Sequence, residues 1–124
     1  MKAIFTIKTC QSNKSSIIDY VVDLRKIENI WKYIKIKMDE DQQQVLFIPE
    51  GFGHGFLTLQ DNTLINYKVN KYYSPSHSKT IIYNDNFMNL NFDYIQTNKL
   101  ILSKNDKKGI TLSDLKKNNF DKLL

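Results

Sequence analysis

The sequence predicts an all-β domain of antiparallel strands, and three observations support this prediction. The chain has 124 residues, a length that is enough for one packed core but short for two, and 12% of the residues are aromatic, which supports a packed interior. Apolar residues recur with a period of two over most of the chain, as they do in half-buried strands. Segments rich in turn-forming residues separate the apolar runs, which is typical of a sandwich or barrel.

The expected strands follow one another along most of the chain. In chain order they read KAIFTIK, SIIDYVVDL, WKYIKIKM, QVLFIP, GFLTL, NTLINYKVN and KTIIYND. In the third run, Ile34, Ile36 and Met38 share one face, as expected for a half-buried strand. The connectors QSNKS, MDEDQQQ and SPSHS are polar, and a turn is expected at residues 60–62. Near the end of the chain, Thr111 or Ser113 is placed to cap a short helix. We therefore expect a single domain over residues 1–124 with a short helical tail.

Charge and cysteine content exclude several classes of protein. The formal net charge is +5, but Arg25 is the only arginine, and the lysines are scattered along the chain. Proteins that read nucleic acids usually depend on arginine, so we expect no nucleic-acid partner. Cys10 is the only cysteine, which excludes an intrachain disulfide and a cysteine-based metal site. No apolar run has the length of a signal peptide or a membrane span, so we expect a cytoplasmic protein without a membrane partner.

The stretch FIPEGFGHGF, residues 47–56, holds three of the four glycines of the chain together with His54. Either it is a tight turn that happens to contain a histidine, or its backbone is shaped to present that histidine. Glycine permits positive φ and close backbone approach, which would set the direction of the imidazole. The pattern Pro49-x-Gly51-x-x-His54 resembles the second conserved motif of the cupin jelly rolls, whose histidine points into the barrel. We therefore expect a cupin-like antiparallel barrel.

Several motifs in the same order resemble the dTDP-4-dehydrorhamnose 3,5-epimerase family, metal-free cupin-fold enzymes of nucleotide-sugar metabolism. These motifs are DYVVDLRK, IPEGFGHGF, a YK pair 13 residues after His54, YYSP, ND and LSKND. The resemblance implies proton abstraction and return beside the ketone of a dTDP-linked 4-keto-6-deoxyhexose. It also implies a role in rhamnose-type deoxysugar and cell-surface polysaccharide biosynthesis, no cofactor and no bound metal, and a homodimer.

The resemblance also assigns roles to individual residues. Tyr67 matches the tyrosine that serves as the acid, and Asp106 matches the aspartate that orients the catalytic histidine. The residues expected to contact substrate are His54, Glu50, Tyr73, Lys2 and Lys68. Each role has a structural alternative: Tyr67 as a core tyrosine, Asp106 as a solvated residue of a Lys/Asp-rich tail, and His54 as a rim histidine.

The sequence departs from the family in one respect. Family members carry an RGLH-type motif upstream, whose histidine is the general base, and we expect this chain to be shortened at its N-terminus. Its only histidines are His54 and His77, which lie too far apart to form the facial triad of a metal dioxygenase. Three hypotheses follow: an epimerase whose base is His54 or comes from a partner chain, a catalytically degenerate homologue that binds nucleotide sugar, or a partner subunit of another sugar enzyme.

Overall fold

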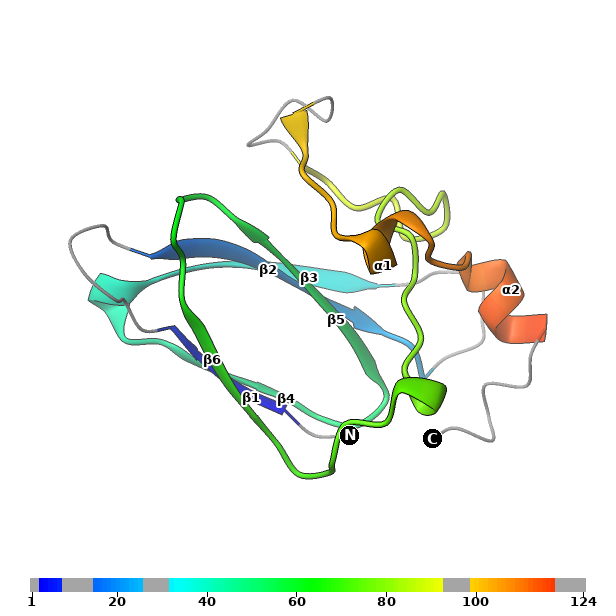
Figure 1. Cartoon of the computed structure of the whole chain (residues 1–124), viewed down its shortest axis with the longest axis horizontal. Coiled ribbons are helices and arrows are strands. Elements are labelled where there is room, and N and C mark those ends of the chain that lie inside the picture. The colour runs from blue at the N-terminus through cyan, green and yellow to red at the C-terminus, as the bar shows by residue number, and fades with distance from the viewer. Residues whose placement is uncertain (1–2, 8–14, 26–31, 93–98, 118–124) are drawn as a thin grey trace. The chain divides into compact units, whose positions relative to one another are not determined.

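A computed structural model describes residues 3–7, 15–25, 32–92 and 99–117 of the chain. The chain falls into two compact units, residues 1–72 and 73–124, and each is described here by itself. The first unit holds the strands, and the second holds the short α-helices (Figure 1). The expectation of a single domain stays a prediction.

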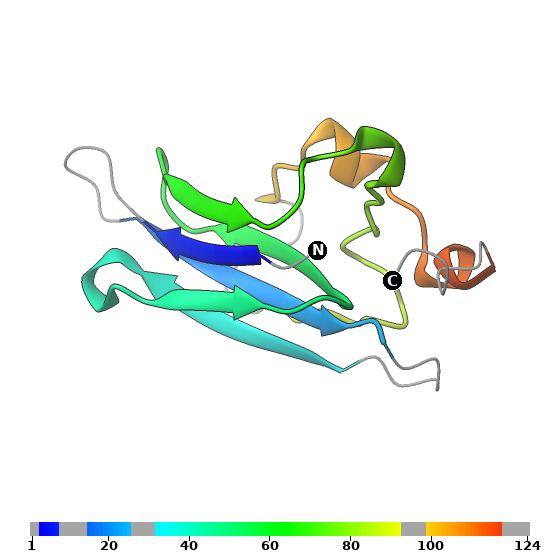
Figure 2. The same cartoon turned by 90° about the horizontal axis from the view of Figure 1, so that it is seen from below.

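Among the described residues of the first unit, six antiparallel strands form two three-stranded sheets (Figure 2). They are β1 (Ala3–Ile7), β2 (Ser16–Asp23), β3 (Tyr33–Asp39), β4 (Val45–Ile48), β5 (Phe52–Thr58) and β6 (Ile65–Val69). One sheet has the order β4-β1-β6 and the other the order β3-β2-β5. A 3₁₀ turn, η1 (Glu40–Gln42), connects β3 to β4. All six strands overlap runs that the period of two had predicted.

The core of this unit lies between the two sheets. Val21 of β2 packs with Ile48 of β4, and Ile65 of β6 packs against both. Ile17 and Met38 form a second cluster, and both are 1% exposed. We call the side of each sheet that carries these residues its inner face. Since side chains alternate along a strand, every second residue from Ile17 or Ile65 also belongs to an inner face.

The turn from β4 into β5 explains one of the clustered glycines. Gly51 has a φ of +87°, and a Cβ built at this position would clash with Cγ of Arg25. Only glycine adopts this backbone easily and leaves room for that side chain. The Arg25 guanidinium lies 4.4 Å from the centre of the Phe52 ring, and its hydrogen bonds to Asp23 raise its pKa. By contrast, a Cβ at Gly55 would meet nothing within 4 Å.

The described part of the second unit contains three short helical segments. They are η2 (Pro75–His77), α1 (Lys104–Lys107) and α2 (Leu112–Lys117). Ser103 caps α1 by accepting a hydrogen bond from the Asp106 amide at 3.1 Å. Thr111 caps α2 in the same way, because its hydroxyl oxygen accepts a hydrogen bond from the Asp114 amide. The predicted cap of the helical tail is therefore Thr111 and not Ser113.

The strand predicted at residues 79–85 is wrong. The structure shows only a single bridge there, between Ile81 and Ile110. The reason is Asp85, which is 4% exposed and accepts hydrogen bonds from three backbone amides. Its Oδ1 accepts from Phe87 and Met88, and its Oδ2 accepts from Leu112 at the start of α2. A carboxylate that binds nearby amides offers the backbone an alternative to a sheet ladder.

Candidate functional site

An Asp–His pair lies on the inner face of the sheet β3-β2-β5. In the register of β2 and β5, His54 lies opposite Val21, and Phe56 lies opposite Asp19. Asp19 is two residues from both Ile17 and Val21, so its side chain points between the sheets. The distance between Asp19 Oδ2 and His54 Nε2 is 2.7 Å. The strand register thus brings together two side chains 35 positions apart in the sequence.

Burial makes this pair unusual. The Asp19 side chain is 0% exposed and that of His54 is 17% exposed. A buried carboxylate without good partners is costly, yet Asp19 Oδ1 has no hydrogen-bond partner among the residues that the structure describes. A carboxylate held against one ring nitrogen fixes the orientation and tautomer of an imidazole. The pair therefore presents an oriented histidine, the arrangement that proton transfer requires.

Phe56 lies beside the imidazole. It is two residues after His54 on the same strand, and the two ring centres are 6.1 Å apart with planes tilted by 42°. The Phe56 side chain is nevertheless 47% exposed. One side of His54 is therefore bordered by an aromatic surface that solvent or a ligand can reach.

Tyr67 lies on the inner face of the other sheet. It is two residues after Ile65, which packs on Val21 of the facing sheet, and it is 59% exposed. Tyr67 and His54 therefore point into the space between the same two sheets from opposite layers. Lys68, the next residue, lies on the other face of β6 by the same alternation.

The remaining predicted contacts of the first unit are less central. Glu50 is exposed in the turn between β4 and β5. Lys2 lies outside the described residues. The substrate-binding roles assigned to Glu50, Lys2 and Lys68 stay predictions.

Asp106, in the second unit, takes part in the cap of α1. Its Oδ2 accepts a hydrogen bond from the Ser103 hydroxyl at 2.6 Å, and its backbone amide donates one to Ser103 Oγ at 3.1 Å. This reciprocal pair is a common way to begin a helix. The catalytic role that the resemblance implied for Asp106 stays a prediction.

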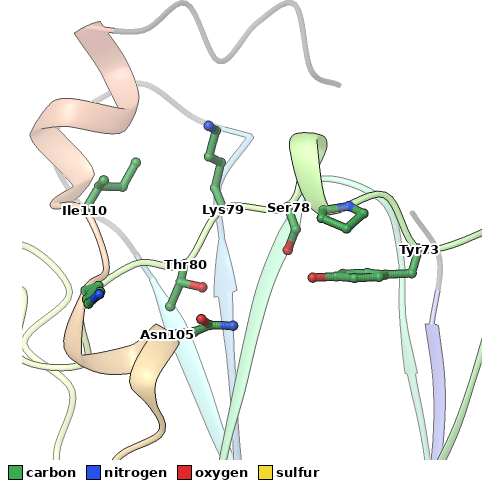
Figure 3. Close-up of a pocket in the computed structure, with 8 residues that line it drawn as sticks. Tyr73, Ser78, Lys79, Thr80, Asn105 and Ile110 are labelled. Carbon is green, nitrogen blue, oxygen red and sulfur yellow. The ribbon is translucent and has the colours of Figure 1, made fainter.

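Tyr73 borders a polar pocket of about 390 Å³ within the second unit. The lining residues are Tyr73, Pro75, Ser78, Lys79, Thr80, Asn105, Lys108 and Ile110. Figure 3 shows the Tyr73 and Ser78 hydroxyls pointing toward one another and Thr80 beside Asn105. Two lysines and no Asp or Glu are among the lining residues, so the pocket suits a polar anionic ligand.

The described residues contain no group of three or more His, Cys, Asp or Glu side chains placed to hold a metal ion. Among the same residues, no helix has the length and apolar character needed to cross a membrane.

Sequence reasoning missed Asp19, although a signal was present. An acidic residue stands at an inward position of an otherwise apolar strand, between Ile17 and Val21. Such a residue is either solvated or paired with a polar group that the fold brings to it. His54 in the glycine-rich stretch was the candidate partner.

Comparison with known proteins gives a consistent result. Residues 5–114 match the family described as dTDP-4-dehydrorhamnose 3,5-epimerase. The chain is 35% identical over 109 residues to the enzyme of that name from Escherichia coli, covering 87% of this chain and 58% of the relative. It is 32% identical over 95 residues to the one from Methanothermobacter thermautotrophicus, covering 76% and 51%. A crystal structure of dTDP-4-dehydrorhamnose 3,5-epimerase from Bacillus anthracis, with TDP and PPi bound, superposes with a TM-score of 0.76 at 28% identity, covering 90% and 59%. The chain thus spans less than two thirds of the length of these relatives. The structural similarity confirms the predicted all-β, cupin-like fold class.

Proposed function

Because the chain belongs to the dTDP-4-dehydrorhamnose 3,5-epimerase family, we propose that it moves protons at the carbons beside the ketone of a dTDP-linked 4-keto-6-deoxyhexose. The observation that carries this proposal is the His54–Asp19 pair on one inner face with Tyr67 on the other. An imidazole and a phenol on facing layers suit a reaction in which a proton leaves one face of a carbon and another arrives on the opposite face.

The proposed steps use only these side chains and the substrate. His54, oriented by Asp19, takes the proton from the carbon next to the ketone, and the C–H electron pair forms an enolate. The Tyr67 hydroxyl then donates its proton to the opposite face of that carbon, which restores the ketone. The imidazolium and the phenolate return to their starting states by exchange with solvent. Such general acid–base catalysis contributes on the order of 10²–10⁴-fold to a rate.

We also propose that the pocket beside Tyr73 binds a nucleoside diphosphate. Lys79 and Lys108 in its lining are point charges that suit phosphate oxygens, and the Tyr73 ring offers a surface on which a base can stack. The crystal structure of the Bacillus anthracis relative contains bound TDP and PPi, both of which carry a diphosphate. Titration with TDP tests the assignment: Lys79→Ala and Lys108→Ala should each weaken binding several-fold, whereas Lys117→Ala, in α2, should not. Equal affinity in all three variants would reject the assignment.

One observation favours a second candidate, a homologue that binds nucleotide sugar without turnover. The Asp106 carboxylate accepts from Ser103 in a helix cap, whereas the family pattern assigns this aspartate to a catalytic histidine. The two candidates share ligand binding and differ in chemistry. The expected homodimer is a separate proposal, and sedimentation showing only monomer at micromolar concentration would reject it.

Solvent exchange separates the candidates. The protein is incubated with dTDP-4-keto-6-deoxyglucose in D₂O, and deuterium at carbons 3 and 5 is followed by mass spectrometry and NMR. We expect exchange that falls by about 10²-fold or more in His54→Ala and Tyr67→Phe. Tyr72→Phe is the matched control, since Tyr72 is fully exposed. Saturable binding without any exchange would establish the second candidate instead.

A further inference from the structure

The Phe56 ring is an aromatic surface beside the candidate base. Its centre lies 6.1 Å from that of the His54 imidazole, and the side chain is 47% exposed although it belongs to an inner face. Phe52, on the same face of β5, behaves differently because it packs against the buried Val21–Ile48 cluster. Phe56 therefore offers apolar area next to the reactive group, where a ligand would cover it.

The chemistry of the proposed substrate indicates what would cover this ring. In a 4-keto-6-deoxyhexose, carbon 5 lies beside the ketone and carries both the labile hydrogen and the methyl group. A base that reaches the hydrogen must therefore approach within contact distance of the methyl group. Carbon 3, on the other side of the ketone, carries a hydroxyl instead.

We infer that Phe56 is a specificity-determining residue that contacts the C5 methyl group of the sugar. This inference rests on the proposed function. The ring favours a 6-deoxy sugar over one that lacks carbon 6, because the methyl group leaves water for an apolar surface. One methyl-sized group in an apolar site gives roughly a 10–200-fold preference for the ligand that carries it over the ligand that lacks it. Contact with Phe56 also favours proton transfer at carbon 5 over carbon 3.

Binding of two stable ligands without a ketone tests the inference independently of turnover. dTDP-6-deoxyglucose carries the methyl group, and dTDP-xylose lacks it. Calorimetric titration of the wild-type protein should give at least about tenfold tighter binding of the first. Phe56→Ala should bring the ratio near one, and Phe56→Leu should leave an intermediate preference. Phe47→Ala is the matched control: Phe47 is a comparably exposed phenylalanine (56%) on β4, and it alternates with the inward-facing Leu46 and Ile48.

The exchange assay provides the second readout. In Phe56→Ala, deuterium entry at carbon 5 should fall about tenfold more than entry at carbon 3, a difference that general loss of folding would not produce. An unchanged methyl preference in Phe56→Ala would overturn the inference even if exchange proceeds. A methyl preference that depends on Phe56, found without any exchange, would uphold the inference and reject the proposed turnover. Failure of the wild-type protein to bind either ligand would overturn both.

Discussion

Asp19 Oδ2 lies 2.7 Å from His54 Nε2 inside a sandwich whose neighbouring inward residues are apolar. Asp19→Asn keeps the shape of the side chain but replaces the carboxylate by an amide, which no longer enforces the same imidazole tautomer. We expect proton exchange into the substrate to slow by roughly 10²–10⁴-fold while ligand binding changes little. The rate should be followed against pH, because a merely structural role would leave the shape of the profile unaltered. Asp61→Asn, in the exposed turn after β5, is the control; wild-type exchange in Asp19→Asn would remove Asp19 from the mechanism.

Asp106 can be tested for a role beyond its helix cap. Ser103→Ala removes the hydrogen bond from the Ser103 hydroxyl to the Asp106 carboxylate, and Asp106→Asn replaces this charged acceptor by a weaker, neutral one. If capping is its function, both variants should lose about 1 kcal/mol of stability and keep the exchange rate of the wild type. Denaturant unfolding and the D₂O assay on the same samples measure the two quantities. A loss of exchange confined to Asp106→Asn would instead support the catalytic role that the sequence resemblance implied.

Two glycines of the stretch 47–56 should respond differently to alanine. Gly51 has a φ of +87°, and a Cβ there would clash with Arg25, so Gly51→Ala should cost roughly 1–3 kcal/mol. Gly55→Ala meets open space and should be neutral or slightly stabilising, because it reduces the entropy of the unfolded chain. Chemical denaturation of the two variants measures the difference. Equal stability would show that the conformation of Gly51 is not required.

The Asp85 carboxylate should be the main support of the second unit. Replacing it by alanine leaves the buried amides of Met88 and Leu112 without an acceptor, at a cost of roughly 1–3 kcal/mol each. Thermal unfolding or hydrogen exchange of the Leu112 amide measures the loss. Asn86→Ala, at the exposed neighbouring position, should change neither quantity. Intact protection of Leu112 in Asp85→Ala would mean that other groups hold the start of α2.

The cap of α2 should weaken in acid. The hydrogen bond from the Thr111 hydroxyl lowers the pKa of Asp114 from its usual 3.8. A lowered folded-state pKa stabilises the helix start above pH 3.8, and this stabilisation is lost as the pH falls through the folded value below it. Protection of the Leu115 amide, which bonds to the Thr111 carbonyl, should therefore decline over this range. Asp114→Asn should remove this pH dependence. If the pH dependence persists in Asp114→Asn, another titrating group is responsible for it.

The sequence was sufficient for features that depend on local patterns. A period of two locates the six strands because alternation is a property of each strand alone, and the cap of α2 follows from a hydroxyl three residues before an acid. It was insufficient where distant residues meet. The role of Asp19 depends on its hydrogen bond to His54, 35 positions away. Asp85 prevents a strand partly by accepting a hydrogen bond from the amide of Leu112, 27 positions away. Neither separation is visible to a local rule.

The strand order β4-β1-β6 has a consequence for how the chain folds. β1 precedes both of its partners in the chain, yet it is central in its sheet, and those partners begin only at Val45 and Ile65. On the ribosome it stays unpaired until most of the first unit has emerged. Closing two such long loops makes folding slow for a chain of this size, on the order of milliseconds to seconds. Until β4 arrives, the nascent segment AIFTI is an apolar strand with unpaired edges, which favours aggregation.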